Sequence, residues 1–470
     1  MYPVASSFIP ITVALARFIE IHGFGGNYPF WYLGSTPTKY LIGPLAPYLL
    51  IGFHKLLPFL NLFDISLILI LLSFGGSALG WGMLTFQLSK DKKLAILAGL
   101  LILILPWHVV WDLAFGEVSA VLAASLTPWV LLAFAKLQIT NYKLQIIVPA
   151  AAFALLLLTN STAAIPAMVG LLILGFLKNK KWDKGLKQAG LVIILGWVVS
   201  SFWYGPNYWF TVWGAPSFGG RNVISTFVWV IELLRGFIPV LIAVWVLVFK
   251  LKKQSLLGKF IYLWLGSFGL LTLFRFMANV HFWLDWTVWL PQVEVGVALL
   301  FAIKLHPRFK QKIIRFSVPF AIFLIYIVGG WVLAMSKHEY WMPSRSIEGR
   351  VEYQIAKELS KTVKTNETVF LSGTTAFWLN SLVDARQVRG GRDEASQDPA
   401  WRQVEWEVRS GSNLGTAYPL LKSAGVDFIV VHTQSSKEFY HDFQFPLKFE
   451  NSLNFEKIYE SDGDIIYKIH

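Results

Sequence analysis

The fold class is decided by residues 65–89, which read ISLILILLSFGGSALGWGMLTFQLS and contain no charged side chain. A helix needs about 20 apolar residues to cross a hydrocarbon core of about 30 Å, so this stretch is long enough to span a membrane. Comparable apolar runs occupy residues 94–111, 189–204 and 313–335. Since 55% of the 470 residues are hydrophobic, one soluble core could not bury them all. The sequence therefore predicts a polytopic α-helical membrane protein.

The connections between the apolar runs predict the topology. Runs begin near residues 65, 94, 118, 144, 161, 189, 223, 257, 287 and 313, which predicts about ten spans. Alternate connections carry most of the lysines and arginines that precede Ser336, and such basic loops usually face the cytoplasm. The basic connections are residues 90–93, 136–143, 178–187, 250–259 and 304–315. By this parity, both ends of the chain are expected on the outer side of a cell membrane.

Three regions are predicted from this topology. Residues 1–64 form a first extracytoplasmic loop with interfacial helices, residues 65–336 form the transmembrane bundle, and residues 337–470 form a small extracytoplasmic α/β domain. Residues 44–60 approach the length of a span, but three prolines and the His54-Lys55 pair favour a helix at the membrane interface. Counting residues 44–60 as a span would instead place the first 40 residues in the cytoplasm.

Local patterns predict the elements of the C-terminal domain. Residues 350–363 have the apolar periodicity of a helix, and residues 368–373 and 426–433 are short apolar runs typical of strands. The end of the chain is expected to form a hairpin around Asp462-Gly463. The polar stretch from residue 380 to 398 is interpreted as a solvated loop, with contact to glycans as the alternative.

Composition excludes several classes of function. The absence of cysteine rules out disulfides and thiolate metal sites. The net charge of +13 arises from basic residues in predicted membrane loops, so it gives no support to nucleic-acid binding. No P-loop, GxSxG, HExxH or dinucleotide-binding motif is present, and the nine histidines contain no metal-spaced pair.

The scarce acidic residues of the predicted outer side are candidates for chemistry, because charge inside hydrocarbon is costly. Asp112 and Glu117 lie in WHVVWDLAFGEVSA, residues 107–120, with His108 one turn before Asp112. Two interpretations stand for this pair: a helix cap in a solvated turn, or a base, metal ligand or sugar contact at the mouth of a cavity. Glu20, in the first predicted loop, is the third acidic candidate.

Basic residues outside the cytoplasmic loops are candidates for phosphate binding. Arg221, Arg235 and Arg275 lie near the predicted outer boundary, and the planar guanidinium group matches phosphate oxygens. Arg235 and Arg275 could therefore hold a lipid-linked phosphate, although ordinary salt bridges are an equal alternative. Glu294, about two turns into its predicted span, should face the bundle interior and need a partner, which Arg235 or Arg275 could be. An internal ion pair that fixes helix packing and a ligand site are equal alternatives for Glu294.

Several stretches resemble a known family. YPFWYLGSTPTKYLIGPLAPYLL (residues 28–50), GTTAFWLNSLVDARQVRGGRDEASQDPAW (residues 373–401) and LKSAGVDFIVVH (residues 421–432) resemble the prokaryotic membrane proteins labelled 6-pyruvoyl-tetrahydropterin-synthase-related. The members of this family look like glycosyltransferases of the GT-C superfamily. The resemblance covers nearly the whole chain, but no zinc-binding histidine set supports the pterin part of the label.

The resemblance implies a helical bundle with its active site at the outer membrane face. It further implies a polyprenyl-phosphate sugar as donor and an acidic residue of the first outer loop as base. Ser6 and Ser7 of ASSFIPI (residues 5–11) stand where that acid is expected, so the chain is either truncated or degenerate. The family's Gln-aromatic-Pro-x-Arg pattern appears here as PQVEVGV (residues 291–297), without the arginine.

The leading hypothesis is a GT-C-like glycosyltransferase that transfers a sugar from a polyprenyl-phosphate donor to an envelope glycan, lipid or protein. Its candidate residues are Glu20, Asp112 and Glu117 for chemistry and Arg235 and Arg275 for phosphate. The sequence identifies no resident cofactor and leaves a divalent metal open. A non-catalytic membrane scaffold or binding protein in envelope assembly is the alternative, and a transporter is the third.

Overall fold

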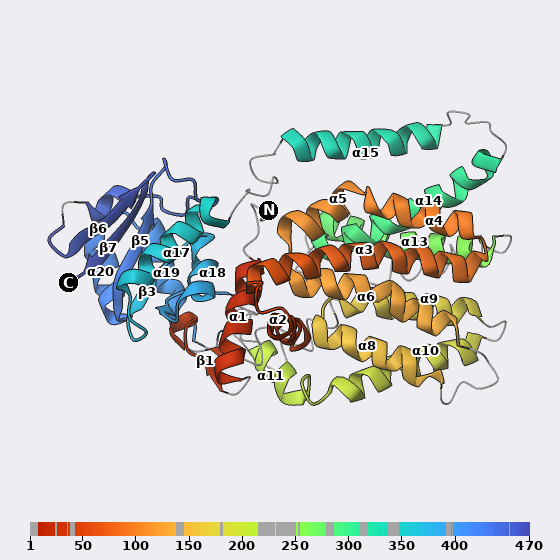
Figure 1. Cartoon of the computed structure of the whole chain (residues 1–470), viewed down its shortest axis with the longest axis horizontal. Coiled ribbons are helices and arrows are strands. Elements are labelled where there is room, and N and C mark those ends of the chain that lie inside the picture. The colour runs from red at the N-terminus through yellow and green to blue at the C-terminus, as the bar shows by residue number, and fades with distance from the viewer. Residues whose placement is uncertain are drawn as a thin grey trace. The chain divides into compact units, whose positions relative to one another are not determined.

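The computed structural model describes most of the chain, and the chain divides into two compact units. The described residues are 8–23, 26–34, 36–37, 43–137, 145–178, 182–214, 231, 251, 254–278, 286–310, 318–336, 347–391, 396, 398–450 and 452–470. One unit, here called the sheet unit, comprises Met1–Ser66, Gly205–Asn222 and Pro343–His470. The other, the helical unit, comprises Leu67–Tyr204 and Val223–Met342. Figure 1 shows the elements of each unit, and each is described by itself.

The helical unit contains most of α3 and a series of further apolar helices. Its elements are α3 (Leu62–Ser89), α4 (Lys92–Leu103), α5 (Pro106–Val109), the π-helical segment η3 (Val110–Phe115), α6 (Val118–Ala135), α8 (Ile147–Thr159), α9 (Ala164–Lys178), α10 (Trp182–Ser200), α13 (Leu256–Ala278), α14 (Trp286–Lys310) and α15 (Val318–Ser336). The start of α4 illustrates how a local residue determines where a helix begins. The Asp91 carboxylate accepts hydrogen bonds from the backbone N–H groups of Lys93 (3.0 Å) and Leu94 (3.2 Å), as an N-cap residue does.

The length and composition of the apolar helices support the predicted membrane protein, but the predicted number of about ten spans is not confirmed. Among the described residues, four helices are long and apolar enough to cross a membrane, or five if the bent pair α4 and α5 is one span. The four are α3, α6, Leu256–Leu273 of α13 and Trp289–His306 of α14. Helices also stand at the predicted spans near residues 144, 161, 189 and 313, whereas the run from residue 223 lies almost wholly outside the described residues.

Small residues allow helices of this unit to approach closely. Gly175 of α9 and Gly185 of α10 face each other so closely that a Cβ atom on either would overlap the backbone of the other helix. A Cβ atom at Gly80 of α3 would lie 2.7 Å from the ring of Pro128 in α6. Small side chains at such crossings are typical of membrane helices, where close van der Waals packing replaces hydrophobic driving force.

The C-terminal part of the sheet unit is the predicted α/β domain. Its elements are η5 (Ile347–Gly349), α17 (Val351–Thr362), β3 (Thr368–Phe370), α18 (Thr375–Leu382), β4 (Arg386–Gln387), α19 (Ala400–Ser410), α20 (Leu414–Ser423), β5 (Val426–His432), η7 (Pro446–Phe449), β6 (Phe455–Ser461) and β7 (Asp464–Ile469). The strands form one sheet in the order β4-β3-β5-β7-β6. The first three strands are parallel, and β7 pairs antiparallel with both β5 and β6.

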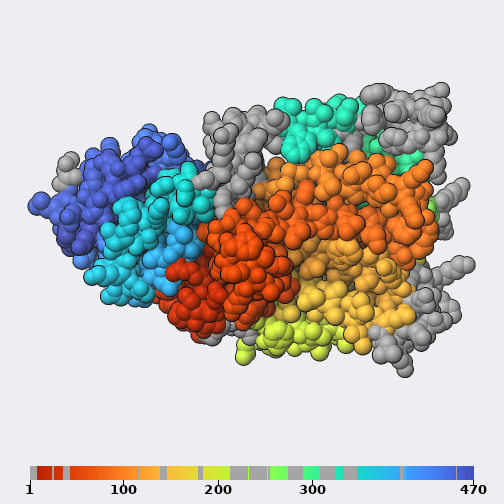
Figure 2. Space-filling model, viewed as in Figure 1, coloured from red at the N-terminus to blue at the C-terminus, as the bar shows by residue number. Residues whose placement is uncertain are grey.

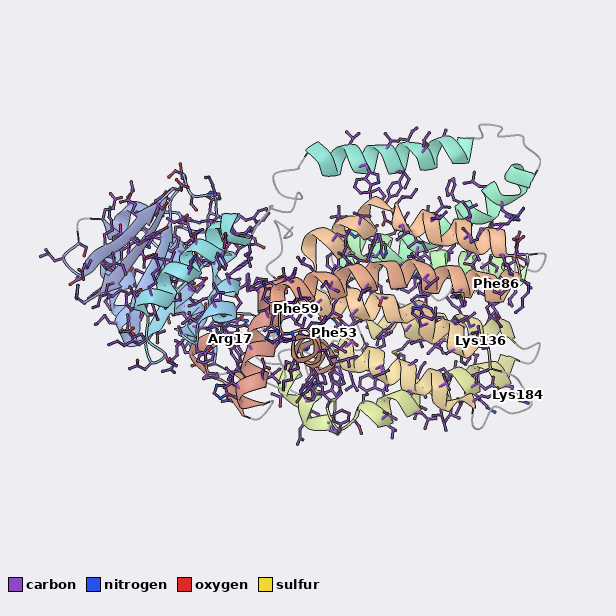
Figure 3. The ribbon with its side chains drawn as sticks, viewed as in Figure 1. Arg17, Phe53, Phe59, Phe86, Lys136 and Lys184 are labelled. Carbon is purple, nitrogen blue, oxygen red and sulfur yellow. The ribbon has the colours of Figure 1, made fainter. Side chains whose placement is uncertain are left out.

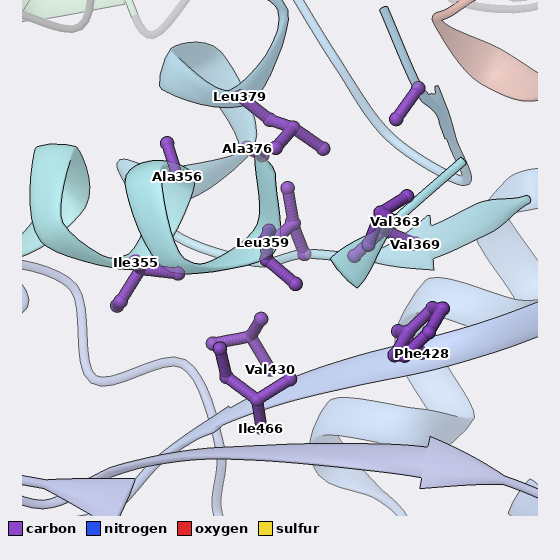
Figure 4. Close-up of a cluster of buried hydrophobic side chains, with 12 residues drawn as sticks. Ile355, Ala356, Leu359, Val363, Val369, Ala376, Leu379, Phe428, Val430 and Ile466 are labelled. Atoms are coloured by element: carbon purple, nitrogen blue, oxygen red, sulfur yellow. The ribbon is translucent and has the colours of Figure 1, made fainter. Parts of the chain in front are cut away.

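The core of this domain lies between the sheet and the helices α17 and α18 (Figure 4). Ile355 and Leu359 of α17 pack there with Leu379 of α18 and with Phe428 and Val430 of β5. The predicted helix at residues 350–363 and its apolar face are therefore confirmed. A second layer, on the other side of the strands, is aromatic and includes Phe370, Phe443, Phe449, Phe455 and Tyr467.

The predicted C-terminal hairpin is confirmed, and the predicted solvated loop is corrected. Asp462 (φ 48°) and Gly463 (φ 87°) connect β6 to β7, and two positive φ values are what a tight two-residue hairpin turn requires. In contrast, residues 380–398 include the end of α18 and strand β4, and Asn380 and Gln387 are buried and hydrogen-bonded to each other. Asn380 and Gln387 therefore lie inside the domain, which the sequence pattern did not indicate, whereas residues 392–395 and 397 lie outside the described residues.

The N-terminal part of the sheet unit comprises α1 (Phe8–His22), β1 (Asn27–Tyr28), η1 (Tyr32–Gly34), β2 (Thr36–Pro37) and α2 (Leu45–Leu56), and α11 (Pro206–Gly214) belongs to the same unit. Helix α1 packs against α2 and against α18, so its apolar side chains are buried by protein. Figure 2 shows the red atoms of this segment against the blue atoms of the C-terminal domain. Helix α2 has 12 residues, or about 18 Å at 1.5 Å per residue, which is shorter than a hydrocarbon core.

Candidate functional site

A cluster of buried polar groups in the described part of the helical unit lies where a helix is broken. Helix α4 ends at Leu103, and the helix that starts at Pro106 leaves at an angle of 59°. Leu105 is extended (φ −65°, ψ 123°), and Pro106 occupies the first helical position, which proline favours because its missing N–H needs no partner there. The chain then passes through the π-helical segment η3 and stops at Gly116, which is left-handed (φ 59°).

Asp112 lies on this π-helical segment and is buried, with 1% of its surface exposed. The nearest charged or titratable partner in the described residues is His108, whose Nε2 lies 3.4 Å from Oδ2 of Asp112. Neither carboxylate oxygen of Asp112 accepts a hydrogen bond from the described residues. A buried carboxylate without hydrogen bonds is costly, and such groups commonly serve chemistry or contact a ligand. The burial rules out the solvated-turn interpretation for Asp112.

The surroundings of Glu117 differ from those of the buried pair Asp112 and His108. It is half-buried, directly precedes α6, and its Oε1 accepts a hydrogen bond from the hydroxyl of Ser119 at 2.9 Å. The short connection therefore contains two different carboxylates, one buried beside an imidazole and one at the start of a helix. Of these two carboxylates, only Asp112 is buried without a hydrogen bond from the described residues, as expected of a group that binds a ligand or a proton.

Glu294 is buried, as predicted, but its described partners are not arginines. Its carboxylate accepts hydrogen bonds from the backbone N–H groups of Trp107 (3.1 Å) and His108 (2.8 Å), and from the hydroxyl of Tyr326. The first N–H groups of a helix have no partner within it and carry partial positive charge, so a carboxylate is stabilised there. Glu294 of α14 thereby fixes the start of α5, to which Asp112 is connected.

The sequence did not identify Tyr326 or the two backbone donors as partners of Glu294. Proline at the first helical position does predict that the next two N–H groups are free, but not which carboxylate reaches them. The described residues hold no group of three or more histidine, aspartate or glutamate side chains that could bind a metal.

The remaining predicted site residues fall in three places. Glu20 is exposed near the end of α1, in the sheet unit. Arg275 is in α13, but its side chain lies outside what the structure describes, and Arg235 lies outside the described residues altogether. The same holds for Arg221, Ser6 and Ser7. The structure therefore describes the surroundings of Glu20, Asp112 and Glu117 alone among the candidates.

The motif FWYLG (residues 30–34) has a structural role inside the sheet unit. The backbone N–H of Gln387 donates to the carbonyl of Phe30 at 2.8 Å, and the hydroxyl of Tyr32 donates to the carbonyl of Gly390 at 2.7 Å. The ring of Trp31 is fully buried against Gly390 and Gly391, where a Cβ atom at either glycine would overlap it. The two stretches that carry the family resemblance thus bind each other.

An ion pair reinforces the same contact. Arg17 of α1 lies 3.2 Å from Asp384, which follows α18, and Figure 3 labels Arg17 where its helix meets the C-terminal domain. Arg386 donates to the carbonyl of Leu33 at 3.2 Å. The N-terminal segment and the C-terminal domain therefore form one packed body within the sheet unit.

Comparison with known proteins identifies the fold. The sequence matches no family model and no curated protein. ArnT from Cupriavidus metallidurans in the apo state matches the structure with a TM-score of 0.58 and 13% identity, over 100% of this chain and 94% of that chain. ArnT bound to undecaprenyl phosphate matches with a TM-score of 0.58 and 12% identity, over 99% of this chain and 94% of that chain.

An archaeal oligosaccharyltransferase also matches. AglB from Archaeoglobus fulgidus, in complex with an inhibitory peptide and a dolichol-phosphate, has a TM-score of 0.53 and 12% identity, over 91% of this chain. The chain covers 66% of the length of AglB, or about two thirds. The resemblance to the 6-pyruvoyl-tetrahydropterin-synthase-related proteins stays a prediction, because no family model matches. The chain shares the fold of ArnT and AglB, with apolar helices long enough to cross a membrane and a small C-terminal sheet domain.

Proposed function

We propose that the protein is a membrane glycosyltransferase that transfers a sugar from a polyprenyl-phosphate donor to a cell-envelope acceptor. The observation that carries the proposal is the match over the full length of the chain to ArnT, which has been solved with undecaprenyl phosphate bound. AglB, solved with a dolichol-phosphate, supports the same class of lipid. The proposal includes about ten spans, the regions 1–64, 65–336 and 337–470, and a reaction at the outer membrane face.

In the proposed reaction, a hydroxyl oxygen of the acceptor bonds to the anomeric carbon of the sugar. The bond from that carbon to the phosphate oxygen breaks, its electron pair leaves with the lipid phosphate, and the hydroxyl proton passes to a base. Asp112 is our first candidate for that base or for orienting the acceptor, because it is buried beside His108 and accepts no hydrogen bond from the described residues. Its acceptor capacity is thereby available to a hydroxyl group.

The other residues of interest would position the site or contact the substrates. Glu294 and Tyr326 hold the start of α5 and so position the helix that carries His108 and Asp112. Glu20 and Glu117 remain candidates for acceptor contacts. Arg235 and Arg275 remain candidates for the lipid phosphate, because a guanidinium group would stabilise the charge that develops on the leaving phosphate.

The experiment is a transfer assay on the full-length protein in nanodiscs. Undecaprenyl-phosphate sugars labelled in the sugar are supplied one at a time with a membrane extract as acceptor, and both label transfer and release of undecaprenyl phosphate are measured. Loss of a general base typically lowers the rate by about 10² to 10⁴, so Asp112→Asn should lower transfer by about 10² or more. Asp91→Asn is the matched control, because asparagine also caps a helix and Asp91 lies at the start of α4.

Two results would contradict the proposal. The first is an absence of transfer from every polyprenyl-phosphate sugar, together with an unchanged cellular phenotype for Glu20→Gln and Asp112→Asn. That result would favour the non-catalytic scaffold. The second is transfer that Asp112→Asn and Asp91→Asn affect equally, because Asp112 would then have no special role in the reaction.

A further inference from the structure

A cleft of about 460 Å³ opens inside the sheet unit, which is within the range of 300–1,000 Å³ typical of small-molecule sites. Both parts of the unit line it. Its walls are Phe18, His22, Asn27, Pro29 and Phe30 from the N-terminal segment, and Thr365, Asp384 and Arg386 from the C-terminal domain. The cleft exists because the FWYLG motif binds the C-terminal domain, as described above.

One wall of the cleft is aromatic and rigid. Phe18 and Phe30 lie with their ring centroids 6.0 Å apart at an interplanar angle of 89°, and each is 6% exposed. Tyr28 packs edge-on against both rings, at 4.7 Å from Phe18 and 5.4 Å from Phe30. Because each ring is only 6% exposed, the two rings contribute a small apolar part of the lining, which can contact C–H groups of a ligand.

The other lining residues are mostly polar, and several of them have planar side-chain groups. Asp384 is 27% exposed and is held by Arg17, and Arg386 is exposed while only its Nη2 donates to Leu33. His22, Asn27 and Thr365 are also exposed. Carboxylate, guanidinium and amide groups can each make two parallel hydrogen bonds, which fits adjacent hydroxyl groups on a ring.

Buried donors lie beside Asp384 without hydrogen-bond partners in the described residues. The hydroxyl of Tyr28 and Nη1 of Arg17 are both buried and make no hydrogen bond there, and both groups interact electrostatically with Asp384. Burial raises the pKa of Tyr28 well above its usual value, so the phenol keeps its proton and remains a donor. Buried donors are nearly always satisfied by protein, water or ligand, so each of these two groups is available to an acceptor, although neither residue is part of the lining of the cleft.

We propose that this cleft binds a short saccharide that carries an acidic group. The aromatic wall would contact the C–H face of a sugar ring, and Asp384, Asn27 and Thr365 would bind its hydroxyl groups. Arg17, which is not part of the lining, pairs with Asp384 at 3.2 Å, and no carboxylate of the described residues pairs with Arg386, so the positive charge of Arg386 is available to a ligand. The acidic group of the saccharide binds Arg386. This binding requires no donor lipid and no transfer reaction, so it stands or falls independently of the proposed function.

The test is saturation-transfer NMR on the full-length protein in nanodiscs, with two disaccharide probes. One contains glucuronate and the other contains glucose at the same position. We expect saturation transfer to ring C–H protons of both probes and binding of the acidic probe that is tighter by about fivefold to tenfold, the value of one exposed charge-assisted hydrogen bond. Arg386→Gln should remove this preference, and Asn27→Ala should weaken the binding of both probes.

The control is Lys364→Gln, which removes an exposed positive charge next to Thr365 without altering the lining of the cleft. It should bind both probes like the original protein. Absence of saturation transfer to either probe at millimolar concentration would overturn the proposal. An equal preference for the acidic probe in Arg386→Gln would do the same, as would an equal loss in Lys364→Gln, since attraction would then depend on net charge alone.

Discussion

The hydroxyl of Tyr32 donates a hydrogen bond of 2.7 Å to the carbonyl of Gly390, a residue 358 positions later in the chain. It also lies 3.2 Å from the carbonyl of Gly391. Through these contacts the N-terminal segment completes the C-terminal domain, because the ring of Trp31 fills the space that side chains at the two glycines would occupy. The interface of the sheet unit therefore depends on a few residues at each side.

The first prediction concerns this interface. Tyr32→Phe removes the hydroxyl and leaves a buried carbonyl without its partner, which should lower the free energy of unfolding by about 1 kcal/mol. Gly390→Ala should have a larger effect, because the added Cβ overlaps the Trp31 ring. Thermal unfolding followed by tryptophan fluorescence in nanodiscs measures both. Tyr418→Phe is the control, since its hydroxyl bonds the exposed C-terminal residue His470, and equal effects of the two tyrosine variants would contradict the prediction.

Local elements of the C-terminal domain could be predicted from the sequence. The spacing of Ile355 and Leu359 indicated a helix, and Asp462-Gly463 indicated a hairpin, because both patterns depend on neighbouring residues. The membrane helices could be predicted for the same reason, since a span needs only a continuous apolar run. None of these predictions required knowledge of contacts between residues far apart in the sequence.

The candidate site could be predicted only in part. Asp112 and His108 are four residues apart, so their pairing follows from helical spacing. The contacts of Glu294 with Trp107 and His108 join residues 187 and 186 positions apart, and no local pattern specifies them. The predicted pairing of Glu294 with Arg235 or Arg275 stays a prediction, because both arginine side chains lie outside what the structure describes.

The second prediction separates chemistry from structure at the broken helix. Glu294→Leu removes the acceptor for two backbone N–H groups and for the Tyr326 hydroxyl, which should lower the free energy of unfolding by about 3 kcal/mol. Asp112→Asn removes a buried charge and no hydrogen bond from the described residues, so stability should be unchanged or higher.

Thermal unfolding in nanodiscs measures the two variants side by side. The control is Glu117→Gln, which is half-buried and keeps an oxygen for Ser119. A loss of stability in Asp112→Asn as large as that in Glu294→Leu would show that Asp112 is a structural residue, and would remove it from the candidate site.

The third prediction concerns pH. Burial raises the pKa of Glu405 to about 7, although Arg389 and Arg409 act in the opposite direction. Because this folded-state pKa lies above the ordinary value of 4.5, folding favours the protonated form. The contribution of Glu405 to stability is then fully present below about pH 4.5 and is lost as pH rises through about 7.

The measurement for Glu405 compares unfolding temperatures of the original protein and Glu405→Gln from pH 4.5 to pH 8. The glutamine variant cannot ionise, so it should gain stability relative to the original protein as pH rises through this window. Glu460→Gln, at an exposed position paired with Lys457, which stays charged over this range, should show a difference that stays constant with pH. A constant difference for Glu405→Gln as well would show that burial does not shift its titration.

The fourth prediction concerns Lys448, which closes the C-terminal end of α19. Its ammonium group donates to the carbonyls of Glu407 (3.2 Å), Val408 (2.7 Å) and Gly411 (2.5 Å), which lie at the end of the helix, where carbonyls have no following helical turn to bond. Positive charge is favourable at a helix C-terminus, and hydrogen bonds from a charged donor are stronger than neutral ones. Lys448→Met keeps the apolar stem and removes all three bonds, so the free energy of unfolding should fall by about 2 kcal/mol.

The matched control for Lys448 is Lys437→Met, which removes an exposed ion pair with Asp462 and should change stability by less than about 0.5 kcal/mol. Hydrogen exchange of the backbone amides provides a second readout, because loss of the cap should increase exchange in the last turn of α19 and leave β5 protected. Burial lowers the pKa of Lys448 to about 8, so the comparison belongs at pH 6, where the ammonium group is charged in the folded protein. Equal stability losses in the two variants, or unchanged exchange at the end of α19, would show that the three carbonyls do not depend on Lys448.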